Sequence, residues 1–351
     1  MLILRRCRLK GCSGTSHHLW AQRMIIFSEV LAVLSVMNVK QLAKNIWGVR
    51  DVVEWLRVRR IVDARALPVE ARVAIMMDKY EARFGYRMDI RHPKTYTEKL
   101  QWYKAYYTGD GHLDRIVDKY LFKQYVQEKL GDGYTVPLLG MWTDIDNLER
   151  DWAQLPEEFC LKSNVQSEGK WIEFIHNKSA VNFQAKRRQW EKWFDPKLTL
   201  IVGPMQAYRN CIPRIIAEQY LENIKNQLFD YKVFCFGGQP FCVEAAMERF
   251  TQDGPSFSFY DLEWNKMDVT SGHHPNHDVP KPLHFDEMLE ISKTLSKDFP
   301  HVRVDFFDTE EKLYVAELTL YTGGGYSIYE PQSFNELMGE LFVLPTDQVE
   351  L

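Results

Sequence analysis

The stretches HVRVDFFD (residues 301–308) and KLYVAELTLYTGGG (residues 312–325) decide the fold of this 351-residue chain. Both read as short β-strands with polar residues among apolar ones, and the second runs into a glycine turn. Asp305 and Glu317 occupy alternating positions that point to one side of the two adjacent strands. Such a pair suits Mg²⁺, which prefers oxygen ligands and keeps waters and phosphates as its other partners. The stretches therefore predict a metal site on a β-sheet.

The residues before these strands change from a helical to an extended period near residue 155. The first third is predominantly helical, because Thr95 and Glu98 have the spacing of a capping box and a further helix is expected from 115 to 129. Beyond it, β-rich runs alternate with helical segments at 180–194 and 285–298. The run YKVFCFGGQPFCVEAA (231–246) is expected to form a hairpin with a glycine turn. Clustered strands with a few helices predict an α+β fold with two sheet-containing lobes.

Composition excludes several classes of protein. The 44 basic and 48 acidic residues give a formal net charge of -4, so no overall field recruits nucleic acid, and no nucleic-acid partner is expected. The six cysteines form no C-x-x-C pair, and four of them lie in apolar runs. They indicate buried thiols in a reducing compartment, which predicts a cytoplasmic location.

The N-terminal region leaves two interpretations open. The apolar run 24–37 is interrupted by Glu29 and is shorter than the roughly 20 residues that span a bilayer. Residues 1–36 are expected to be a dispensable or targeting-like extension, because Met24 and Met37 offer alternative translation starts. Residues 39–62 have helical spacing with a basic complement, and we expect a helix packed on the domain. The alternative for this helix is peripheral contact with an anionic membrane surface.

Lys162 stands in the strand-like run EEFCLKSN (157–164), where its polar neighbours are Ser163 and Asn164. A lysine in an otherwise apolar strand needs an anion. The alternative is an edge strand from which the ammonium group reaches water, which is the commoner arrangement for a lone strand lysine.

Several blocks of sequence resemble the TupA-like ATP-grasp proteins, in the same order, over roughly residues 83–342. The blocks are DIRHPKTYTEKLQWYKAYY (89–107), VDKYLFKQYVQEKLGDGYTVPLLGMW (117–142), FCLKSN (159–164), PRIIAEQYLEN (213–223), DYKVFCFGGQP (230–240), SFYDLEW (258–264), FPHVRVDFF (299–307) and VAELTLYTGGG (315–325). Several blocks in register are far more specific than a lone motif.

The resemblance implies an ATP-grasp fold, which holds ATP between two α+β lobes and makes an acyl phosphate from a carboxylate before an amine displaces the phosphate. It implies that Lys162 contacts ATP phosphates and that Asp305 and Glu317 bind magnesium. The residues Glu218 and Tyr220 would lie at the adenine-binding hinge. Further candidates are Ser167 and Gly169 in the phosphate loop, Lys232 for phosphate, and Arg303 and Arg249 for the carboxylate substrate.

Departures from the family pattern keep other functions open. The phosphate loop reads NVQSEGKW (164–171) where relatives have N-H-G-S-G-G, and Glu168 would face phosphate charge. This favours a catalytically silent nucleotide-binding protein as one alternative. Thr319 stands where ATP-grasp enzymes often have Asn. Asp144 and Asp146 form a D-x-D of the kind that binds nucleotide sugars in glycosyltransferases, although their spacing also suits a helix N-cap.

Together these patterns predict an ATP-dependent carboxylate–amine ligase of cell-surface polysaccharide biosynthesis, cytoplasmic or membrane-peripheral, with ATP and Mg²⁺ as cofactors. The alternatives are a nucleotide-sugar glycosyltransferase and the silent nucleotide-binding protein. The His-rich loop 273–278 is expected to be solvated rather than metal-binding. The expected organisation is an extension (1–36), a helical region (37–90), the N-terminal part of the ATP-grasp unit (91–155) and its nucleotide-binding lobes (156–345).

Overall fold

The structure, a computed structural model, describes residues 68–165, 171–195, 206–208, 210–221, 230–247, 256–272 and 278–346. By its packing the chain divides into residues 1–59 and 60–351, and every described residue belongs to the second unit. The expected extension 1–36 and the expected helix 39–62 therefore lie outside the described residues. None of the helices in the described part combines the length and apolar character that crossing a membrane requires.

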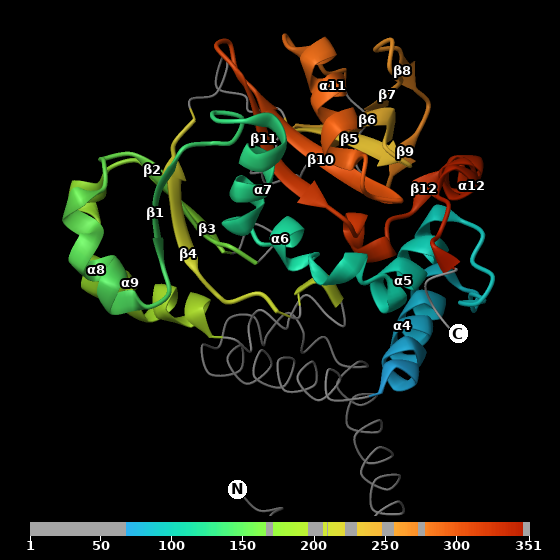
Figure 1. Cartoon of the computed structure of the whole chain (residues 1–351), viewed down its shortest axis with the longest axis horizontal. Coiled ribbons are helices and arrows are strands. Elements are labelled where there is room, and N and C mark those ends of the chain that lie inside the picture. The colour runs from blue at the N-terminus through green and yellow to red at the C-terminus, as the bar shows by residue number, and fades with distance from the viewer. Residues whose placement is uncertain are drawn as a thin grey trace, which may run out of the picture. The chain divides into compact units, whose positions relative to one another are not determined.

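The larger sheet is antiparallel throughout, with the strand order β11-β10-β5-β6-β7-β8 (Figure 1). The predicted hairpin is confirmed as β5 and β6, which meet at Gly237 and Gly238. These two residues have φ angles of 53° and 79°, a left-handed conformation that glycine adopts without a steric penalty. The strands are β5 (Asp230–Phe236), β6 (Gln239–Met247), β7 (Ser256–Tyr260), β8 (Lys266–Met267), β10 (His301–Asp308) and β11 (Leu313–Thr319).

One face of the larger sheet is covered by α11 (Phe285–Ser296), which packs against β10, β5 and β6. Cys235 of β5 interacts with Ser296 of this helix, which identifies the covered face. Val302 pairs with Cys235 and shares that face. Because side chains alternate along a strand, Arg303 and Asp305 point to the opposite face.

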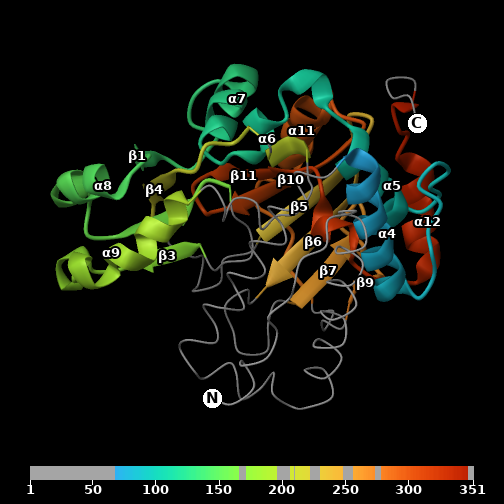
Figure 2. The same ribbon diagram turned by 90° about the horizontal axis from the view of Figure 1, so that it is seen from below.

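Helix α5 (Tyr96–Tyr106) packs on part of that opposite face. The predicted capping box is confirmed, since Thr95 and Glu98 each accept a hydrogen bond from the other's backbone N–H. Tyr96 stands edge-on to His301 and Phe236, with ring centroids 5.1 and 5.8 Å away. Helices α4 (Val69–Phe84) and α12 (Gln332–Leu341) pack against α5, as Figure 2 shows. Tyr96 therefore covers one end of this sheet face, and the charged residues Arg303 and Asp305 lie further along β10.

The smaller sheet has the order β1-β4-β2-β3 and is also antiparallel. Its strands are β1 (Leu138–Trp142), β2 (Phe159–Ser163), β3 (Ile172–Ile175) and β4 (Ile215–Gln219). Helices α8 (Ile145–Asp151) and α9 (Phe183–Glu191) cover one face, where Phe159 and Leu161 of β2 share a core with Trp190. Alternation along β2 then directs Cys160 and Lys162 to the other face.

The prediction of one continuous helix over 115–129 is wrong. The segment forms two helices, α6 (Asp114–Val117) and α7 (Leu121–Leu130). The carboxylate of Asp118 accepts hydrogen bonds from the backbone N–H groups of Tyr120 and Leu121, which starts a new helix at this point. The remaining short elements are β9 (Thr270–Ser271), β12 (Tyr329–Glu330) and the 3₁₀ turns Gly109–Gly111, Trp152–Gln154, Lys178–Ala180, Lys192–Phe194, Gln206–Tyr208 and Thr322–Gly325.

Candidate functional site

The face of the smaller sheet opposite α8 and α9 carries a buried glutamate between two lysines. Glu218 of β4 forms ion pairs with Lys162 of β2 and with Lys123 of α7, and the Lys123 Nζ–Glu218 Oε1 distance is 2.6 Å. Lys162 and Glu218 are diagonal neighbours, because Cys160 is the residue directly opposite Glu218. We call Lys123, Lys162 and Glu218 the lysine cluster.

The alternative in which Lys162 projects from an edge strand into water is wrong. Strand β2 lies between β4 and β3, so Lys162 belongs to an interior strand, and its side chain is only 12% exposed. Sequence reasoning found the need for an anion but not the anion itself, which in this structure is Glu218. The reason is that an antiparallel pairing between β2 and β4 joins segments that are distant in the chain.

The pKa shifts within the lysine cluster reflect burial and mutual attraction. Burial lowers the pKa of Lys162, but Glu218 and more weakly Cys160 outweigh burial, so the pKa of this lysine is raised. Burial raises the pKa of Glu218, and the two lysines overcome that effect and lower it. Burial lowers the pKa of Lys123 despite Glu218. With both lysines protonated, two cations share one carboxylate, which leaves an excess positive charge suited to an anion such as phosphate.

Tyr220 follows the last residue of β4 and is partly buried. Its ring lies edge-on to His176 and Phe174, with centroids 4.9 and 6.2 Å away. The predicted hinge residues thus occupy distinct settings, since Glu218 faces the lysines whereas Tyr220 joins an aromatic group beside β3. The predicted contact of Tyr220 with adenine stays a prediction.

A row of charged residues crosses the face of the larger sheet that lies opposite α11. Glu317 pairs with Asp305, Asp305 with Lys232, and Lys232 with Glu244, on four successive strands. Directly paired residues of antiparallel strands point to the same face, so these four side chains form one line. The predicted metal ligands Asp305 and Glu317 are neighbours in that line.

Arg303 lies beside this row and holds Asp305 in a bidentate ion pair, with Nε–Oδ1 and Nη2–Oδ2 distances of 2.7 and 2.6 Å. Its Nη2 also donates to Thr319 Oγ1 at 3.3 Å, and its Nη1 is 3.8 Å from Glu244 Oε2. Burial raises the pKa of Asp305 although Arg303 opposes it. A bidentate guanidinium keeps this carboxylate charged at neutral pH.

Lys232 is buried and forms an ion pair with Asp230, two residues earlier on the same strand. We call Asp230, Lys232, Glu244, Arg303 and Asp305 the acidic cluster, because its three carboxylates exceed its two cations by one negative charge. All but Arg303 have a relative exposure of 5% or less. A buried excess of negative charge is suited to a metal cation.

Lys119 contacts Glu317, which stands at the β11 end of the charged row. It lies between α6 and α7, and its Nζ is 3.6 Å from Oε1 of Glu317, whose side chain is 29% exposed. The charge of Glu317 also raises the pKa of Lys162, more weakly than Glu218 and Cys160 do. The predicted phosphate lysine and one predicted metal ligand are therefore within electrostatic reach of each other.

Asp305 and Glu317 fit a magnesium ion that is bound together with a nucleotide. Within the described ranges, no three His, Cys, Asp or Glu side chains converge to hold a metal ion unaided. Mg²⁺ bound with a nucleotide needs only one or two protein carboxylates, because phosphates and water complete its shell. Asp305 and Glu317 could supply these carboxylates, and each oxygen of Asp305 that accepts from Arg303 has a second lone pair.

The D-x-D motif has a structural role at the start of α8, as the N-cap interpretation predicted. Asp144 accepts a hydrogen bond from the backbone N–H of Asn147 at 2.8 Å and caps the helix. Asp146 forms an ion pair with Arg187 of α9. The two carboxylates therefore hold α8 and its neighbour rather than converging on a common ligand.

Several predicted site residues lie outside the described residues, namely Ser167, Gly169 and Glu168 of the phosphate loop, Arg249, and the histidines 273, 274 and 277. Asp278 of the His-rich stretch forms an ion pair with Lys266 at 2.7 Å. Sequence reasoning did not single out Lys123, Asp230, Glu244 or Arg214, and it named Asn164 only as a polar neighbour of Lys162. Lys123 follows Lys119 by one helical turn, a spacing that could have flagged it. Nothing in the sequence signalled Asn164 or Arg214 as partners of Asp118.

Comparison with known proteins gives a family match and distant structural likenesses. A sequence profile described as TupA-like ATPgrasp matches residues 98–343. No curated protein matches the chain. Among solved structures, the chain is similar to N5-carboxyaminoimidazole synthetase from Staphylococcus aureus complexed with ADP, at 15% identity and a TM-score of 0.35, over 58% of this chain and 44% of that chain.

Two D-alanine–D-alanine ligases show likenesses of the same kind. The enzyme from Bacillus anthracis complexed with ATP has 12% identity and a TM-score of 0.35, over 60% of this chain and 56% of that one. The enzyme from Helicobacter pylori has 14% identity and a TM-score of 0.37, over 65% and 61%. The chain thus spans about half the length of these solved proteins, and TM-scores this low add nothing to the family match.

Proposed function

Because the chain belongs to the TupA-like ATP-grasp family, we propose that it is an ATP-dependent carboxylate–amine ligase of cell-surface polysaccharide biosynthesis. The observation that carries the proposal is the contact between Lys119 and Glu317, whose Nζ–Oε1 distance is 3.6 Å. The charge of Glu317 also acts on Lys162. A site with cations on one side and carboxylates on the other suits a magnesium–nucleotide complex, whose phosphates are anionic and whose metal is cationic.

The lysine cluster is proposed to bind the phosphates of ATP. Lys162 is held by Glu218, which also has Lys123 as a partner. If Lys162 turns to a phosphate oxygen, Glu218 keeps Lys123 and is not left as an unpaired buried charge. Lys119 is proposed to contact a phosphate as well, because it lies next to Glu317, whose charge also acts on Lys162.

Asp305 and Glu317 are proposed to hold Mg²⁺, with Thr319 beside them. A bound Mg²⁺ would supply neutralisation of negative charge on the phosphates. The protein's own contribution is to keep Asp305 ionised and oriented, which Arg303 does through its two hydrogen bonds. Lys232 and Asp230 support the same face of the sheet from the next strand.

The proposed reaction has two steps. A carboxylate oxygen of the substrate attacks the γ-phosphorus of ATP, the bond from that phosphorus to the bridging oxygen breaks, and ADP leaves. An amine then attacks the acyl carbon, gives up a proton, and inorganic phosphate leaves. Arg303 and Arg249 are proposed to bind the substrate carboxylate, since arginine recognises such groups bidentately. Arg303 would then serve the substrate and Asp305 together.

The cellular setting is part of the proposal. A uronic acid or an amino acid is the proposed source of the carboxylate, the proposed location is cytoplasmic, and residues 39–62 are the proposed region of any peripheral membrane contact. The proposed division places a helical region at 37–90 and the ATP-grasp unit at 91–345. A glycosyltransferase is not proposed, because Asp144 and Asp146 have structural partners at α8.

Trapping of an acyl phosphate tests this proposal. Hydroxylamine, supplied in place of the amine, converts an acyl phosphate to a hydroxamate, which is detected by its iron complex or by mass. We expect hydroxamate and ADP to form together, with ATP and Mg²⁺, for at least one acid in a panel of uronic acids and amino acids. ATP binding without ADP release over the whole panel would identify a silent nucleotide-binding protein. Binding of UDP-sugars but not ATP would contradict the ligase proposal and favour a transferase.

A further inference from the structure

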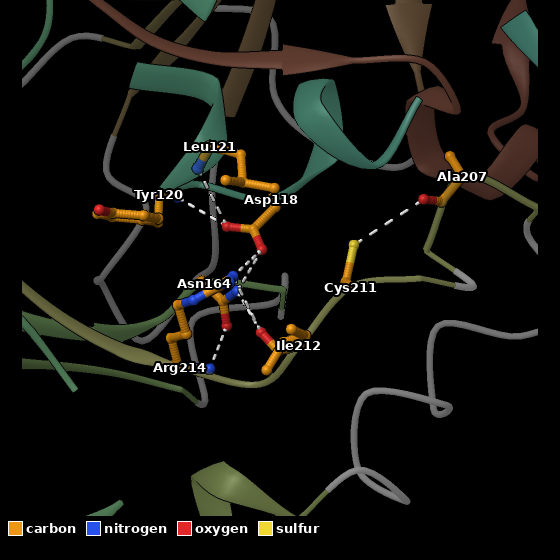
Figure 3. Close-up of polar contacts among 8 residues, drawn as sticks. All are labelled: Asp118, Tyr120, Leu121, Asn164, Ala207, Cys211, Ile212 and Arg214. Carbon is orange, nitrogen blue, oxygen red and sulfur yellow. Dashed lines mark hydrogen bonds and ion pairs between the residues drawn. The ribbon is translucent and has the colours of Figure 1, made fainter. Parts of the chain in front are cut away.

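Three buried residues from distant parts of the chain form a cluster next to the proposed site without belonging to it. They are Asp118 between α6 and α7, Asn164 just after β2, and Arg214 just before β4, and we call them the Asp118 cluster (Figure 3). Asp118 and Asn164 have no exposed surface, and the side chain of Arg214 is 13% exposed. Figure 3 shows their side chains converging from separate segments.

The carboxylate of Asp118 accepts hydrogen bonds in two directions. Its Oδ1 accepts from the backbone N–H groups of Tyr120 and Leu121, at 2.9 and 3.3 Å, and so caps α7. Its Oδ2 accepts from Asn164 Nδ2 at 2.6 Å and from Arg214 Nη1 at 2.8 Å. Four donors use the roughly four acceptor positions of a carboxylate, and only the second pair connects α7 to the smaller sheet.

Asn164 is bonded through both its side chain and its backbone. Its Oδ1 accepts from the backbone N–H of Arg214 at 2.7 Å, and its backbone N–H donates to the carbonyl of Arg214 at 3.1 Å. The carbonyl of Asn164 accepts from the backbone N–H of Lys119 at 2.8 Å. Its Nδ2 also donates to the carbonyl of Ile212 at 2.9 Å. Asn164 therefore fixes the end of β2 to the start of β4 and to the turn that carries Lys119.

Each member of the Asp118 cluster is close in sequence to a residue of the proposed site. Asp118 precedes Lys119, Asn164 follows Lys162 by two residues, and Arg214 directly precedes the strand that contains Glu218. The phosphate loop 164–171 begins at Asn164 itself. A displacement of the cluster would therefore move Lys119 relative to Lys162, and with it the alignment of phosphate contacts and metal ligands.

We propose that Asp118, Asn164 and Arg214 are positioning residues that set the placement of Lys119 and Lys162 for the magnesium–ATP complex. This inference rests on the proposed function but concerns residues that need not touch the nucleotide. A cap alone would require only the Oδ1 contacts of Asp118. The additional contacts of Asp118 Oδ2 and the hydrogen bonds of Asn164 tie three segments together. These segments carry Lys119, Lys162 and Glu218.

The substitution Asp118→Asn separates capping from positioning. The side-chain oxygen of asparagine can still cap α7, but its amide group would face the donors of Asn164 and Arg214, so the link to the smaller sheet is lost. The matched control is Asp144→Asn, because Asp144 also caps a helix, in a place remote from the proposed ligands. The pair Arg214→Lys and Arg214→Met tests whether a conservative cation rescues the effect.

The test measures ATP binding by calorimetry with and without Mg²⁺, together with amide hydrogen exchange of the unliganded proteins. Asp118→Asn and Arg214→Met are expected to weaken magnesium-dependent ATP binding by about tenfold to a hundredfold. They are expected to reduce the gain in affinity that Mg²⁺ provides. Asp144→Asn should bind as wild type does, and Arg214→Lys should recover most of the loss.

Hydrogen exchange distinguishes failure of this inference from failure of the proposed function. In Asp118→Asn, exchange should rise at 159–165 and 214–219, whether or not ATP binds, and should change little at the start of α7, where the asparagine oxygen still accepts from the backbone. If the wild-type protein binds no ATP, the proposed function is wrong. Hydrogen exchange alone would then test whether the Asp118 cluster positions the three segments. Exchange that rises only at the start of α7, or ATP binding unaffected by Asp118→Asn, would overturn the inference.

Discussion

The two sheets carry opposite charge excesses on the faces that form the proposed site. On the smaller sheet, one carboxylate is shared by two lysines. On the larger sheet, three carboxylates surround Lys232 and Arg303. Lys119, in the turn before α7, lies 3.6 Å from Glu317 of the larger sheet, and the charge of Glu317 also raises the pKa of Lys162 on the smaller sheet. The difference indicates a division of labour, in which one sheet favours anionic phosphates and the other favours a cation.

The two clusters also differ in how they tolerate loss of a partner. In the lysine cluster the single acid serves both cations, so its removal leaves two buried like charges. In the acidic cluster each cation has its own close acid, Asp230 for Lys232 and Asp305 for Arg303. Breaking a buried pair is costly because the remaining charge stays unsolvated. We therefore expect the acid of the smaller sheet to be the more critical for stability.

The largest expected effect is the loss of catalysis when Glu317 of the larger sheet is replaced. Glu317→Gln should lower ATP-dependent hydroxamate formation by about a thousandfold or more, which corresponds to about 4 kcal/mol in activation free energy. The reason is that the amide cannot supply an anionic oxygen to Mg²⁺. Steady-state assays at saturating ATP measure this effect, with Asp144→Asn as the control. Retention of wild-type rates would show that Glu317 is not a metal ligand.

Glu218→Gln tests the stability of the lysine cluster. We expect it to lower the free energy of unfolding by about 3 kcal/mol, the lower end of the range for a broken buried pair, since both lysines reach some solvent. Lys123→Met should cost less, because Glu218 keeps Lys162. Urea unfolding measures both variants. If the two substitutions cost the same, the idea that one acid serves both lysines is wrong.

Lys104 of α5, which contacts the glycine turn after β11, tests the pH dependence of stability. Lys104 donates to the carbonyl of Gly324 at 2.6 Å and lies over the ring of Tyr326, as does Lys79. Burial, and then the charge of Lys79, lowers the pKa of Lys104 from 10.5 to about 7. Between these values the unfolded chain binds the additional proton, so stability rises with pH across this window and falls as pH drops toward 7.

One such group contributes at most about 1.4 kcal/mol for each pH unit. Urea unfolding between pH 7 and 10 should show this contribution in the wild-type protein and lack it in Lys104→Met. The difference between the two proteins removes the titration of other groups. An identical pH dependence in both would contradict the assignment to Lys104.

The smallest expected effect lies outside both clusters. Asp144→Ala should lower the free energy of unfolding by about 1 kcal/mol, the usual contribution of a helix N-cap. It should leave ATP binding unchanged and should not affect binding of UDP-sugars, because no such binding is expected. Loss of UDP-sugar binding in this variant would restore the D-x-D motif as a nucleotide-sugar site.

Much of the architecture was accessible from the sequence because it depends on local patterns. The period of two in β10 and β11, the glycine turn between β5 and β6, and the capping box at Thr95 are short-range features, and the structure confirms them. The interruption at Asp118 was missed, because its carboxylate replaces a helical turn by bonding to backbone groups two and three residues on.

The partners of the site residues were less accessible. Sequence reasoning placed Lys162, Glu218, Asp305 and Glu317 near a nucleotide, yet it gave Lys162 no protein partner. The ion pairs with Glu218, and the contact of Lys119 with Glu317, join strands and turns that are far apart in the chain. Arg303 was predicted as a substrate anchor, and its bidentate bond to Asp305 depends on both side chains sharing one face of β10.

Calorimetric titration of ATP, with and without Mg²⁺, tests the division between the two sheets most directly when Lys162→Met and Glu317→Gln are compared with wild type. The account predicts that Lys162→Met weakens ATP binding in both conditions, whereas Glu317→Gln spares metal-free binding and loses the gain that Mg²⁺ provides. Equal losses in both conditions for both variants, or a wild-type affinity that does not respond to Mg²⁺, would contradict it.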